Sequence, residues 1–502
     1  MSGKVYLVGA GPSDPGLLTL RGKEVLERAE VVVYDALVSP ELLALLPAGA
    51  ECINVGKRAS HHLMCQEDIN RLLLQKAREG RRVVRLKGGD PFLFGRGGEE
   101  LELLCENGIP YEIVPGVTSA IAVPAYCGIP VTHRDFCSSL HIVTGHKKQD
   151  EPLQLPFRAL AETKGTLVFL MGLSALRELC AGLIAAGMDE KMPAAILQKG
   201  TTAEQRALCA DLATLPRRAE EEQIETPAIL VVGGVCALRE KFAWREALPL
   251  FGCRVLVTRP RGRAGSLAPR LRDLGAQVIE APTIRTEPIR ENEPLRAALG
   301  NLGTYAWLAF TSPYGVEVFL DALAAGGRDI RQLASLRVAA IGTGTAAALR
   351  RRGLFADLVP ETYDAGHLGK ALRARLQPGE TVLIPRAKMG SPALTEALGE
   401  AARDLPIYET FCEKPAALDL RAELEAHPQT VAVFTSASTV RGFAAAAEGL
   451  DFSRVRAACI GRQTACEAEK LGMQTAVAEE ATLDSLILLV QTMYGGKQDG
   501  TD

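Results

Sequence analysis

The chain has 502 residues, a formal net charge of −3 and 47% hydrophobic residues. This length exceeds the roughly 250–300 residues that one hydrophobic core usually supports, so several domains are expected. The small net charge gives no electrostatic reason to expect a nucleic-acid or membrane partner. No apolar run approaches the roughly 18–20 residues of a membrane span, and the first residues lack signal-peptide features. We therefore expect a soluble, cytoplasmic protein. The twelve cysteines contain no Cys-x-x-Cys pair, so we expect their thiols to be reduced.

The stretch GAGPSDPG follows a short apolar run that is typical of a buried strand. Gly9 and Gly11 suggest the glycine-rich loop of a dinucleotide-binding enzyme. The third glycine of that fingerprint is Asp14 here, where a carboxylate would repel a phosphate. Pro12 and Pro15 also remove two backbone N–H donors from the loop. The sequence therefore argues against a Rossmann oxidoreductase, and the loop requires another ligand.

Short β-branched runs alternate with alanine- and leucine-rich helical patterns along the whole chain. This alternation predicts α/β domains with mostly parallel sheets. A stretch at 236–252, CALREKFAWREALPLFG, lies between the strand-like AILVVGG and a new strand-like run, RVLVTR. We therefore predict a first domain over residues 1–240 and a second over residues 250–492.

The second half contains a degenerate internal repeat. The stretch at 306–319 is similar to that at 431–443, and the stretch at 338–354 is similar to that at 456–473. The repeat predicts two similar α/β lobes, each with a strand–Thr-Ser–helix unit and a strand–Gly–helix unit. Ligands of open α/β sheets lie beyond the carboxyl ends of strands, so the two turns are expected to face a shared cleft. These turns contain Thr311, Ser312, Thr435 and Ser436.

In the first half, the stretch VVRLKGGDPFLFGRGGEE ends a predicted strand at a Gly-Gly-Asp-Pro turn. Gly88 and Gly89 allow close backbone approach, and Asp90 can accept hydrogen bonds from hydroxyl or ammonium groups. Taken alone, such a sequence is typical of an ordinary turn.

Eight motifs together carry a more specific signal. They are VGAGPSDPGLLTL, YDALVS, VGKR, RLKGGDPFLFGRGGEE, VPGVTSA, GIPVTHRD, VTGH and QKGT. In this order they closely resemble the uroporphyrinogen-III C-methyltransferases of the tetrapyrrole methylase family, over about residues 4–240. The resemblance implies two subdomains with S-adenosylmethionine bound in the cleft between them, and a homodimer formed through this half. The first loop would then form a wall of this cleft.

The resemblance also implies a set of donor-site residues, which are Pro12, Gly88, Gly89, Asp90, Leu93, Thr118, Ser119, Met171 and Gly200. Asp35 and Lys57 match family positions proposed for proton handling. The alternative is that Asp35 caps a turn and Lys57 is a solvated charge. No metal is expected, because transfer of a methyl group from a sulfonium needs no Lewis acid; His61 and His62 are more typical of surface or substrate contacts.

Two positions depart from the family pattern. Ser13 stands where a glycine is usual, and Leu170 stands where a tyrosine is common. We expect Ser13 to require a loop conformation with φ below zero. Leu170 removes any contact that the family's tyrosine would make.

The second half resembles uroporphyrinogen-III synthases across about residues 253–490, through VLVTRP, FTSPYGVE, AIGTGTAAAL, VPETYDA, VLIPRA, LPIYET, VFTSAS and IGRQTA. That family closes the linear hydroxymethylbilane into a ring and uses no cofactor. Tyr408 matches the tyrosine thought to assist departure of the substrate hydroxyl; the alternative is a strand-end aromatic that packs against a neighbour. Thr464 matches a threonine proposed at the substrate cleft. Both substrates carry eight carboxylates, which strand-end arginines could bind through paired N–H donors; the candidates are Arg259, Arg261, Arg263 and Arg386.

The two resemblances imply a bifunctional enzyme that makes uroporphyrinogen III from hydroxymethylbilane and methylates it at C2 and C7. The product would be precorrin-2, for sirohaem or cobalamin synthesis, and no segment resembles the dehydrogenase that acts next. One alternative keeps the methylase fold with a later corrinoid or ribosomal RNA as substrate. Another alternative is a methyltransferase that carries a non-catalytic, two-lobed ligand-binding module.

Overall fold

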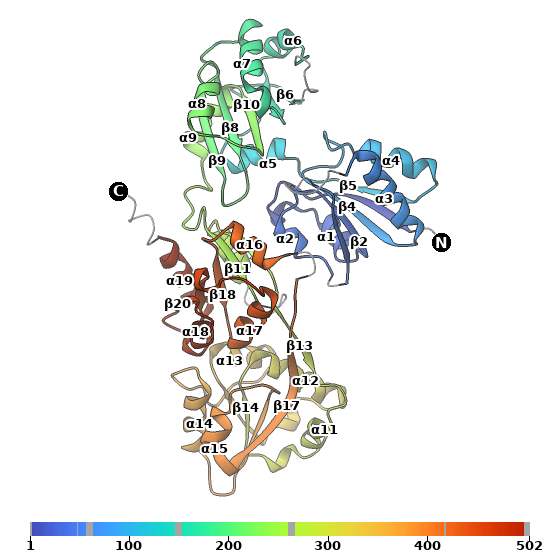
Figure 1. Ribbon diagram of the computed structural model, residues 1–502. Coiled ribbons are helices and arrows are strands. Elements are labelled where there is room, and N and C mark those ends of the chain that lie inside the picture. The colour runs from blue at the N-terminus through green and yellow to red at the C-terminus, as the bar shows by residue number, and fades with distance from the viewer. Residues whose placement is uncertain are drawn as a thin grey trace.

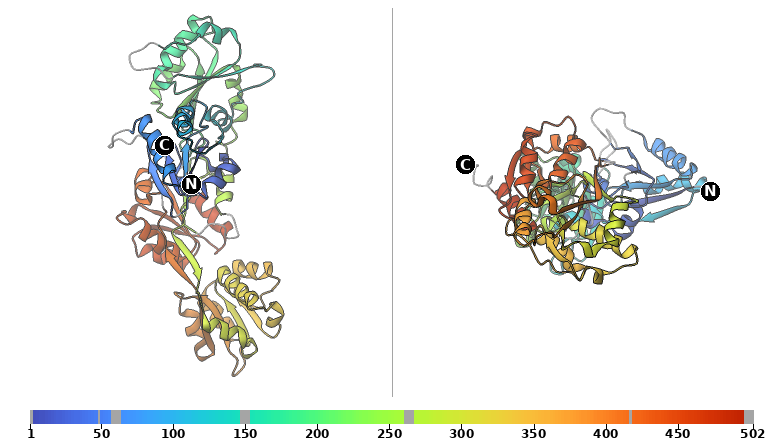
Figure 2. Two further views of the ribbon diagram at one scale, coloured as in Figure 1. Left: turned by 90° about the vertical axis from the view of Figure 1, so that its right-hand side faces the viewer. Right: turned by 90° about the horizontal axis from the view of Figure 1, so that it is seen from below.

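The computed structural model describes residues 3–47, 49–56, 64–145, 153–259, 267–415 and 418–495. These residues form four five-stranded sheets in an elongated molecule (Figures 1 and 2). The two sheets of the first half lie above the two lobes of the second half in Figure 1. No helix within the described ranges has the length and apolar character needed to cross a membrane.

The first sheet is parallel throughout, in the order β3-β2-β4-β1-β5. Its strands are β1 (Lys4–Gly9), β2 (Val31–Tyr34), β3 (Glu51–Asn54), β4 (Arg82–Lys87) and β5 (Tyr111–Val114). Its helices are α1 (Leu20–Leu26), α2 (Pro40–Leu43), α3 (Gln66–Arg78) and α4 (Gly97–Glu106), with a 3-10 turn η1 (Pro15–Leu17). Helices cover both faces, which explains why β2 is a continuous apolar run with every residue buried. The carboxyl ends of β1, β4 and β2 are adjacent, and this brings three predicted site loops together.

The second sheet has the order β6-β7-β10-β8-β9. Its strands are β6 (Leu140–Thr144), β7 (Thr166–Leu170), β8 (Pro193–Gln198), β9 (Arg206–Asp211) and β10 (Ala228–Val232), and its helices are α5 (Ser119–Tyr126), α6 (Phe157–Glu162), α7 (Leu176–Ala185), α8 (Leu215–Glu221) and α9 (Arg239–Phe242). Only β6 and β7 pair in parallel, so the prediction of mostly parallel sheets is wrong here. The connection 199–205 is too short for the crossover that parallel neighbours need.

The third sheet is parallel, in the order β12-β11-β18-β19-β20. It consists of β11 (Arg254–Val257), β12 (Gln277–Glu280), β18 (Val431–Phe434), β19 (Arg456–Cys459) and β20 (Gln474–Val477), with α10 (Leu267–Asp273), α16 (Leu420–Ala426), α17 (Ala437–Ala446), α18 (Arg462–Glu469) and α19 (Leu483–Gly495).

The fourth sheet has the order β13-β17-β16-β14-β15, in which only β13 and β17 are antiparallel. It consists of β13 (Ile284–Pro288), β14 (Trp307–Phe310), β15 (Arg337–Ala340), β16 (Val382–Ala387) and β17 (Ala402–Cys412), with α11 (Glu293–Gly300), α12 (Pro313–Ala325), α13 (Thr343–Arg351), α14 (Ala365–Arg373) and α15 (Ala393–Leu398).

The repeat prediction is confirmed, because β14 and β18 each lead through a Thr-Ser turn into a helix, α12 or α17. The strand–Gly–helix units are likewise β15–α13 and β19–α18. The fourth sheet is inserted into the lobe that holds the third, since the chain leaves after β12 and returns after β17 (Figure 1). The two lobes are therefore similar in topology but not consecutive in sequence.

Candidate active sites

Three glycines pack backbone to backbone at the carboxyl edge of the first sheet: Gly9 ends β1, and Gly89 and Gly116 lie in the loops after β4 and β5. A Cβ on Gly116 would lie 2.1 Å from the carbonyl oxygen of Gly89 and 2.6 Å from Cα of Gly9. Gly11 and Gly89 also exchange backbone hydrogen bonds, at 3.2 Å from the Gly11 N–H and 3.0 Å from the Gly89 N–H. Any larger side chain would separate these loops. We call the packed residues Gly9, Gly89 and Gly116 the glycine cradle.

Asp90 holds the loops of the cradle in place. Its Oδ1 accepts hydrogen bonds from the backbone N–H of Phe92 at 2.8 Å and of Leu93 at 3.1 Å, while Oδ2 accepts from Gly116 at 3.0 Å. These bonds occupy three of about four acceptor positions on a carboxylate. Asp90 therefore fixes the Gly-Gly-Asp-Pro turn itself, and a contact with a ligand remains a prediction.

The start of α5 lies beside the same loops. Thr118 caps this helix, since its Oγ1 accepts a hydrogen bond from the N–H of Ala120 at 3.3 Å. A Cβ built on Gly89 would lie 3.8 Å from the backbone nitrogen of Ser119. Two predicted donor-site residues are thus adjacent to the cradle.

The second subdomain contributes Met171 and Gly200. Gly200 packs so closely on α5 that a Cβ there would lie 2.3 Å from Val123 Cγ1. The next residue, Thr201, donates a hydrogen bond from Oγ1 to the carbonyl of Pro12, which joins this loop to the first loop. Met171 is 50% exposed at the end of β7. The Gly200 loop is thus hydrogen-bonded to Pro12 of the first loop. The thioether of Met171, directly after β7, is accessible.

The first loop differs from expectation at Ser13. Its φ is +71°, so the prediction of a φ below zero is wrong: the serine adopts the conformation that a glycine would. The Oγ of Ser39 donates to the Ser13 carbonyl at 2.7 Å, which helps to hold this conformation. Asp14 accepts hydrogen bonds from Gly16 N–H at 2.7 Å and Tyr126 OH at 3.0 Å. Asp14 is therefore a structural residue that connects the loop to α5. Leu170 is buried in the core of the second subdomain.

Asp35 follows β2 and is paired with a buried arginine. Arg85 donates from Nη2 to Asp35 Oδ1 at 2.7 Å and from Nε to Glu100 Oε1 at 3.0 Å. Lys87 donates to the same Glu100 oxygen at 2.8 Å. Arg85 and Glu100 are 2% and 0% exposed, whereas Asp35 is 30% exposed. A buried ion chain thus ends at an accessible carboxylate. Lys57, the predicted partner of Asp35, lies outside the described residues, as do His61 and His62.

The ion chain alters the acid–base properties of its cations. Burial lowers the pKa of Lys87, and the Arg85 charge lowers it further, against the attraction of Glu100. Burial also disfavours the charged form of Arg85, but Glu100 and Asp35 outweigh this effect and raise its pKa. Arg85 and Glu100 are not among the site residues predicted from the sequence. The available signal was a charged residue between apolar positions of a buried strand, RVVRLK, followed by acids in the next helix.

In the second half, Tyr408 lies at the start of α12. Its hydroxyl is 2.8 Å from Ser312 Oγ, which also accepts a hydrogen bond from the N–H of Gly315 at 3.0 Å and so caps the helix. The Tyr408 ring packs edge-on against Tyr314, with ring centroids 4.9 Å apart. The side chain is 7% exposed. The predicted catalytic tyrosine and one Thr-Ser turn are therefore in direct contact.

The other turn has a similar structure. Ser436 caps α17 through a reciprocal pair of hydrogen bonds with Thr439. Thr311 and Thr435 precede the two capping serines and are half-buried. Thr464, in α18, is 4% exposed. A shared cleft between the turns and a substrate contact at Thr464 remain predictions.

The predicted carboxylate-binding arginines are described only in part. Arg259 is half-buried after β11, whereas Arg261 and Arg263 lie outside the described residues. Arg386 is already paired, since Nη2 donates to Asp404 Oδ2 at 2.7 Å. Within the described ranges, no group of three or more His, Cys, Asp or Glu side chains gathers as a metal site would require.

Comparisons with known proteins give matches to two protein families, one in each half of the chain. The family model "Tetrapyrrole (Corrin/Porphyrin) Methylases" matches residues 4–216, and "Uroporphyrinogen-III synthase HemD" matches residues 265–488. The porphyrin biosynthesis protein HemD of Ruminiclostridium josui is 47% identical over 98% of this chain and 99% of that protein. The uroporphyrinogen-III C-methyltransferase of Bacillus subtilis is 42% identical over 71% of this chain and 73% of that protein.

A crystal structure of uroporphyrin-III C-methyl transferase from Thermus thermophilus, complexed with S-adenyl homocysteine, is 40% identical. The match covers 47% of this chain and 100% of that one, with a TM-score of 0.40. The Ruminiclostridium relative matches over nearly its full length, and the two family models fall on the two halves described above. The chain therefore belongs to the family of tetrapyrrole biosynthesis proteins that join a tetrapyrrole methylase domain to a uroporphyrinogen-III synthase domain, and it is a bifunctional enzyme.

Proposed function

We propose that the C-terminal domain cyclises hydroxymethylbilane to uroporphyrinogen III, and that the N-terminal domain methylates this product at C2 and C7 to give precorrin-2. The observation that carries this proposal is the presence of both domain families in one chain. The product of the first reaction is the substrate of the second, so the chain joins consecutive steps. We also propose that the protein is cytoplasmic and forms a homodimer through its methylase domain.

S-adenosylmethionine fits the edge of the first sheet. The backbone at Gly89 is open, since a Cβ there would lie no closer than 3.8 Å to another atom, and Met171 offers a soft, polarizable side chain that suits a sulfonium. When bound, this donor supplies an electrophilic methyl group. We assign its binding to the residues around the cradle, which are Pro12, Gly88, Gly89, Asp90, Leu93, Thr118, Ser119, Met171 and Gly200.

Asp35 is the proposed proton acceptor. Methylation of a pyrrole carbon leaves a cationic adduct that must lose a proton, and a carboxylate can take it. Arg85 donates a hydrogen bond to Asp35 Oδ1 at 2.7 Å, and this charge-assisted contact orients the carboxylate. The accessible position of Asp35 at the end of β2 supports contact with a substrate, and Lys57 is the proposed partner.

Tyr408 is the proposed group that assists hydroxyl departure in the synthase domain. Its hydroxyl lies at the N-terminus of α12, where backbone N–H groups favour negative charge on a nearby oxygen. A phenol in this position can donate its proton to a leaving hydroxyl. Thr311, Ser312, Thr435, Ser436, Thr464, Arg259 and Arg261 are proposed to hold the flexible tetrapyrrole and its carboxylates.

Methyl transfer can be tested with the purified full chain, uroporphyrinogen III and radiolabelled S-adenosylmethionine. The proposal predicts two labelled methyl groups per tetrapyrrole. No incorporation into uroporphyrinogen III, with transfer to a later corrinoid or to RNA instead, would contradict the proposed substrate.

A further inference from the structure

Gln277, the first residue of β12, belongs to the synthase domain, but its side chain contacts both subdomains of the methylase. Its Nε2 donates to Glu41 Oε1 at 2.6 Å, and Glu41 lies in α2 of the first subdomain. Its Oε1 accepts from the backbone N–H of Ala203 at 2.9 Å, in the β8–β9 connection of the second subdomain. Arg254 Nη1 also donates to this oxygen, at 3.4 Å. One amide therefore connects three parts of the molecule.

Both contacts continue to the first loop of the methylase. Ser39, two residues before Glu41, donates to the carbonyl of Ser13 at 2.7 Å. Thr201, two residues before Ala203, donates to the carbonyl of Pro12. The contacts thus form a closed ring that begins at Gln277 and returns to it through two adjacent carbonyls of the loop.

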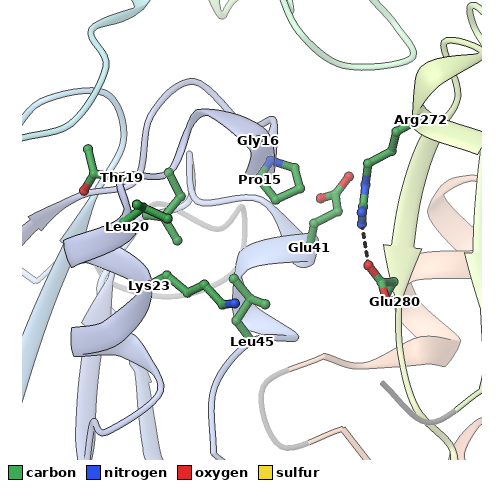
Figure 3. A pocket seen from close by; sticks show the side chains of 10 residues that line it. Pro15, Gly16, Thr19, Leu20, Lys23, Glu41, Leu45, Arg272 and Glu280 are labelled. Carbon is green, nitrogen blue, oxygen red and sulfur yellow. Dashed lines mark hydrogen bonds and ion pairs between the residues drawn. The ribbon is translucent and has the colours of Figure 1, made fainter. Parts of the chain in front are cut away.

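Several side chains of the ring are buried, which makes their contacts important for the geometry. Gln277, Glu41 and Thr201 are 8%, 5% and 3% exposed. Glu41 Oε2 and Arg272 Nε are buried and, among the described residues, have no hydrogen-bond partner. Both residues line a cavity of about 300 Å³ at the boundary of the two domains, which also touches Pro15 and Gly16 of the first loop (Figure 3). With a cavity on one side, packing alone does not fix the Glu41 carboxyl group, and the hydrogen bond from the Gln277 amide helps to hold it.

We propose that Gln277 is a positioning residue for the methyl-donor site, supplied by the synthase domain. Through Glu41 and Ala203, it holds the two methylase subdomains at a fixed separation and holds the first loop against the glycine cradle. This inference rests on the proposed binding of S-adenosylmethionine at that cradle. It means that donor affinity depends on a residue of the neighbouring enzyme.

The test uses the full chain and S-adenosylhomocysteine as the titrated probe, measured by isothermal titration calorimetry. Gln277→Leu should weaken binding about tenfold, because it removes the hydrogen-bond partner of the buried Glu41 carboxyl group and of the part-buried Ala203 N–H. The KM for S-adenosylmethionine should rise by a similar factor, with a smaller change in kcat. Synthase activity should be unchanged, which also shows that the variant is folded. Gln474→Leu is the matched control, since Gln474 begins β20 at the other edge of the same sheet.

A reciprocal exchange separates positioning from simple packing. Gln277→Glu alone places two carboxyl groups together and should weaken binding at least as much as the leucine variant. In the double variant E41Q/Q277E, the amide at 41 donates to the carboxylate at 277, which still accepts from Ala203 and Arg254, so binding should return to within about twofold of the wild type.

Wild-type affinity in Gln277→Leu, or no recovery in the double variant while synthase activity is intact, would overturn the inference. Wild-type protein that fails to bind S-adenosylhomocysteine would contradict the proposed function, and the inference with it.

Discussion

Arg85 Nη2 lies 2.7 Å from Asp35 Oδ1, in a pair that joins a 2% exposed guanidinium to a 30% exposed carboxylate. The contact places a fixed positive charge directly behind the accessible group. Because Glu100 and Lys87 continue the chain of charges into the core, the guanidinium cannot turn away without leaving a buried charge unpaired. The carboxylate is therefore held in one orientation.

Asp35→Asn should lower methyl transfer by about 10²–10⁴, the usual contribution of a positioned acid–base group. The fold should persist, because Arg85 keeps its buried contact with Glu100. Label incorporation into uroporphyrinogen III measures the loss, and the synthase reaction of the same protein is the internal control. Asp68→Asn, on the exposed surface of α3, is the matched substitution. Full methyl transfer by the Asp35 variant would show that this carboxylate does not handle the proton.

Gly116→Ala should abolish donor binding, since its Cβ would lie 2.1 Å from the Gly89 carbonyl and must push the cradle apart. Gly98→Ala is the control, because a Cβ there meets no atom within 4 Å. Titration with S-adenosylhomocysteine compares the two variants. Equal affinity for both would place the donor site away from the cradle.

Much of this arrangement could be predicted from the sequence. The strand–loop pattern placed Gly88, Gly89 and Asp90 at a strand end, and the internal repeat placed the two Thr-Ser turns before helices. These predictions depend on local periodicity, which is visible in one chain. The direction of β10 and the insertion of one lobe into the other could not be predicted this way, because strand pairing is set by contacts between distant segments.

Side-chain roles were less predictable than backbone positions. Asp90 has the residue type of a ligand contact, but its oxygens bind the backbone of its own and a neighbouring loop. Ser13 adopts a positive φ that its residue type disfavours, because Ser39 and the surrounding loops hold it. Gln277 begins an ordinary edge strand, and nothing in its local sequence indicates a partner in the other domain.

Tyr408→Phe should lower the rate of uroporphyrinogen III formation by about 10²-fold, at the low end of the range for a positioned proton donor. The ring and its packing against Tyr314 are kept, so the melting temperature should change little. Ser312→Ala is the matched variant: it removes the Ser312 hydroxyl that contacts Tyr408, and it destabilises α12 by about 0.5–2 kcal/mol through loss of its cap. A wild-type rate in Tyr408→Phe would support the alternative, a tyrosine that only packs.

Glu41→Gln should change the pH dependence of stability. Burial raises the pKa of Glu41, against the opposing effects of the Gln277 hydrogen bond and the Arg254 charge. A folded-state pKa above the unfolded value of about 4.3 means that the free energy of unfolding falls as pH rises between the two values.

Glutamine at this position cannot ionise, so the free energy of unfolding of the variant does not fall with pH for this reason. The melting temperature of Glu41→Gln minus that of the wild type should therefore be larger at pH 8 than at pH 5. The expected change is about 2 °C or more, the shift that 1 kcal/mol gives in domains of this size. Glu24→Gln, on the exposed face of α1, is the control substitution. A melting-temperature difference that does not grow with pH would contradict the conclusion that burial raises the pKa of Glu41.

The most direct test of both enzymatic assignments is one assay of the purified chain with hydroxymethylbilane, with and without S-adenosylmethionine, followed by absorption spectroscopy and chromatography. We predict uroporphyrinogen III without the donor and precorrin-2 with it. Accumulation of the type I isomer, which forms by unguided ring closure, would contradict the synthase assignment and favour a methyltransferase that carries a ligand-binding module. Uroporphyrinogen III that stays unmethylated in the presence of the donor would contradict the methylase assignment.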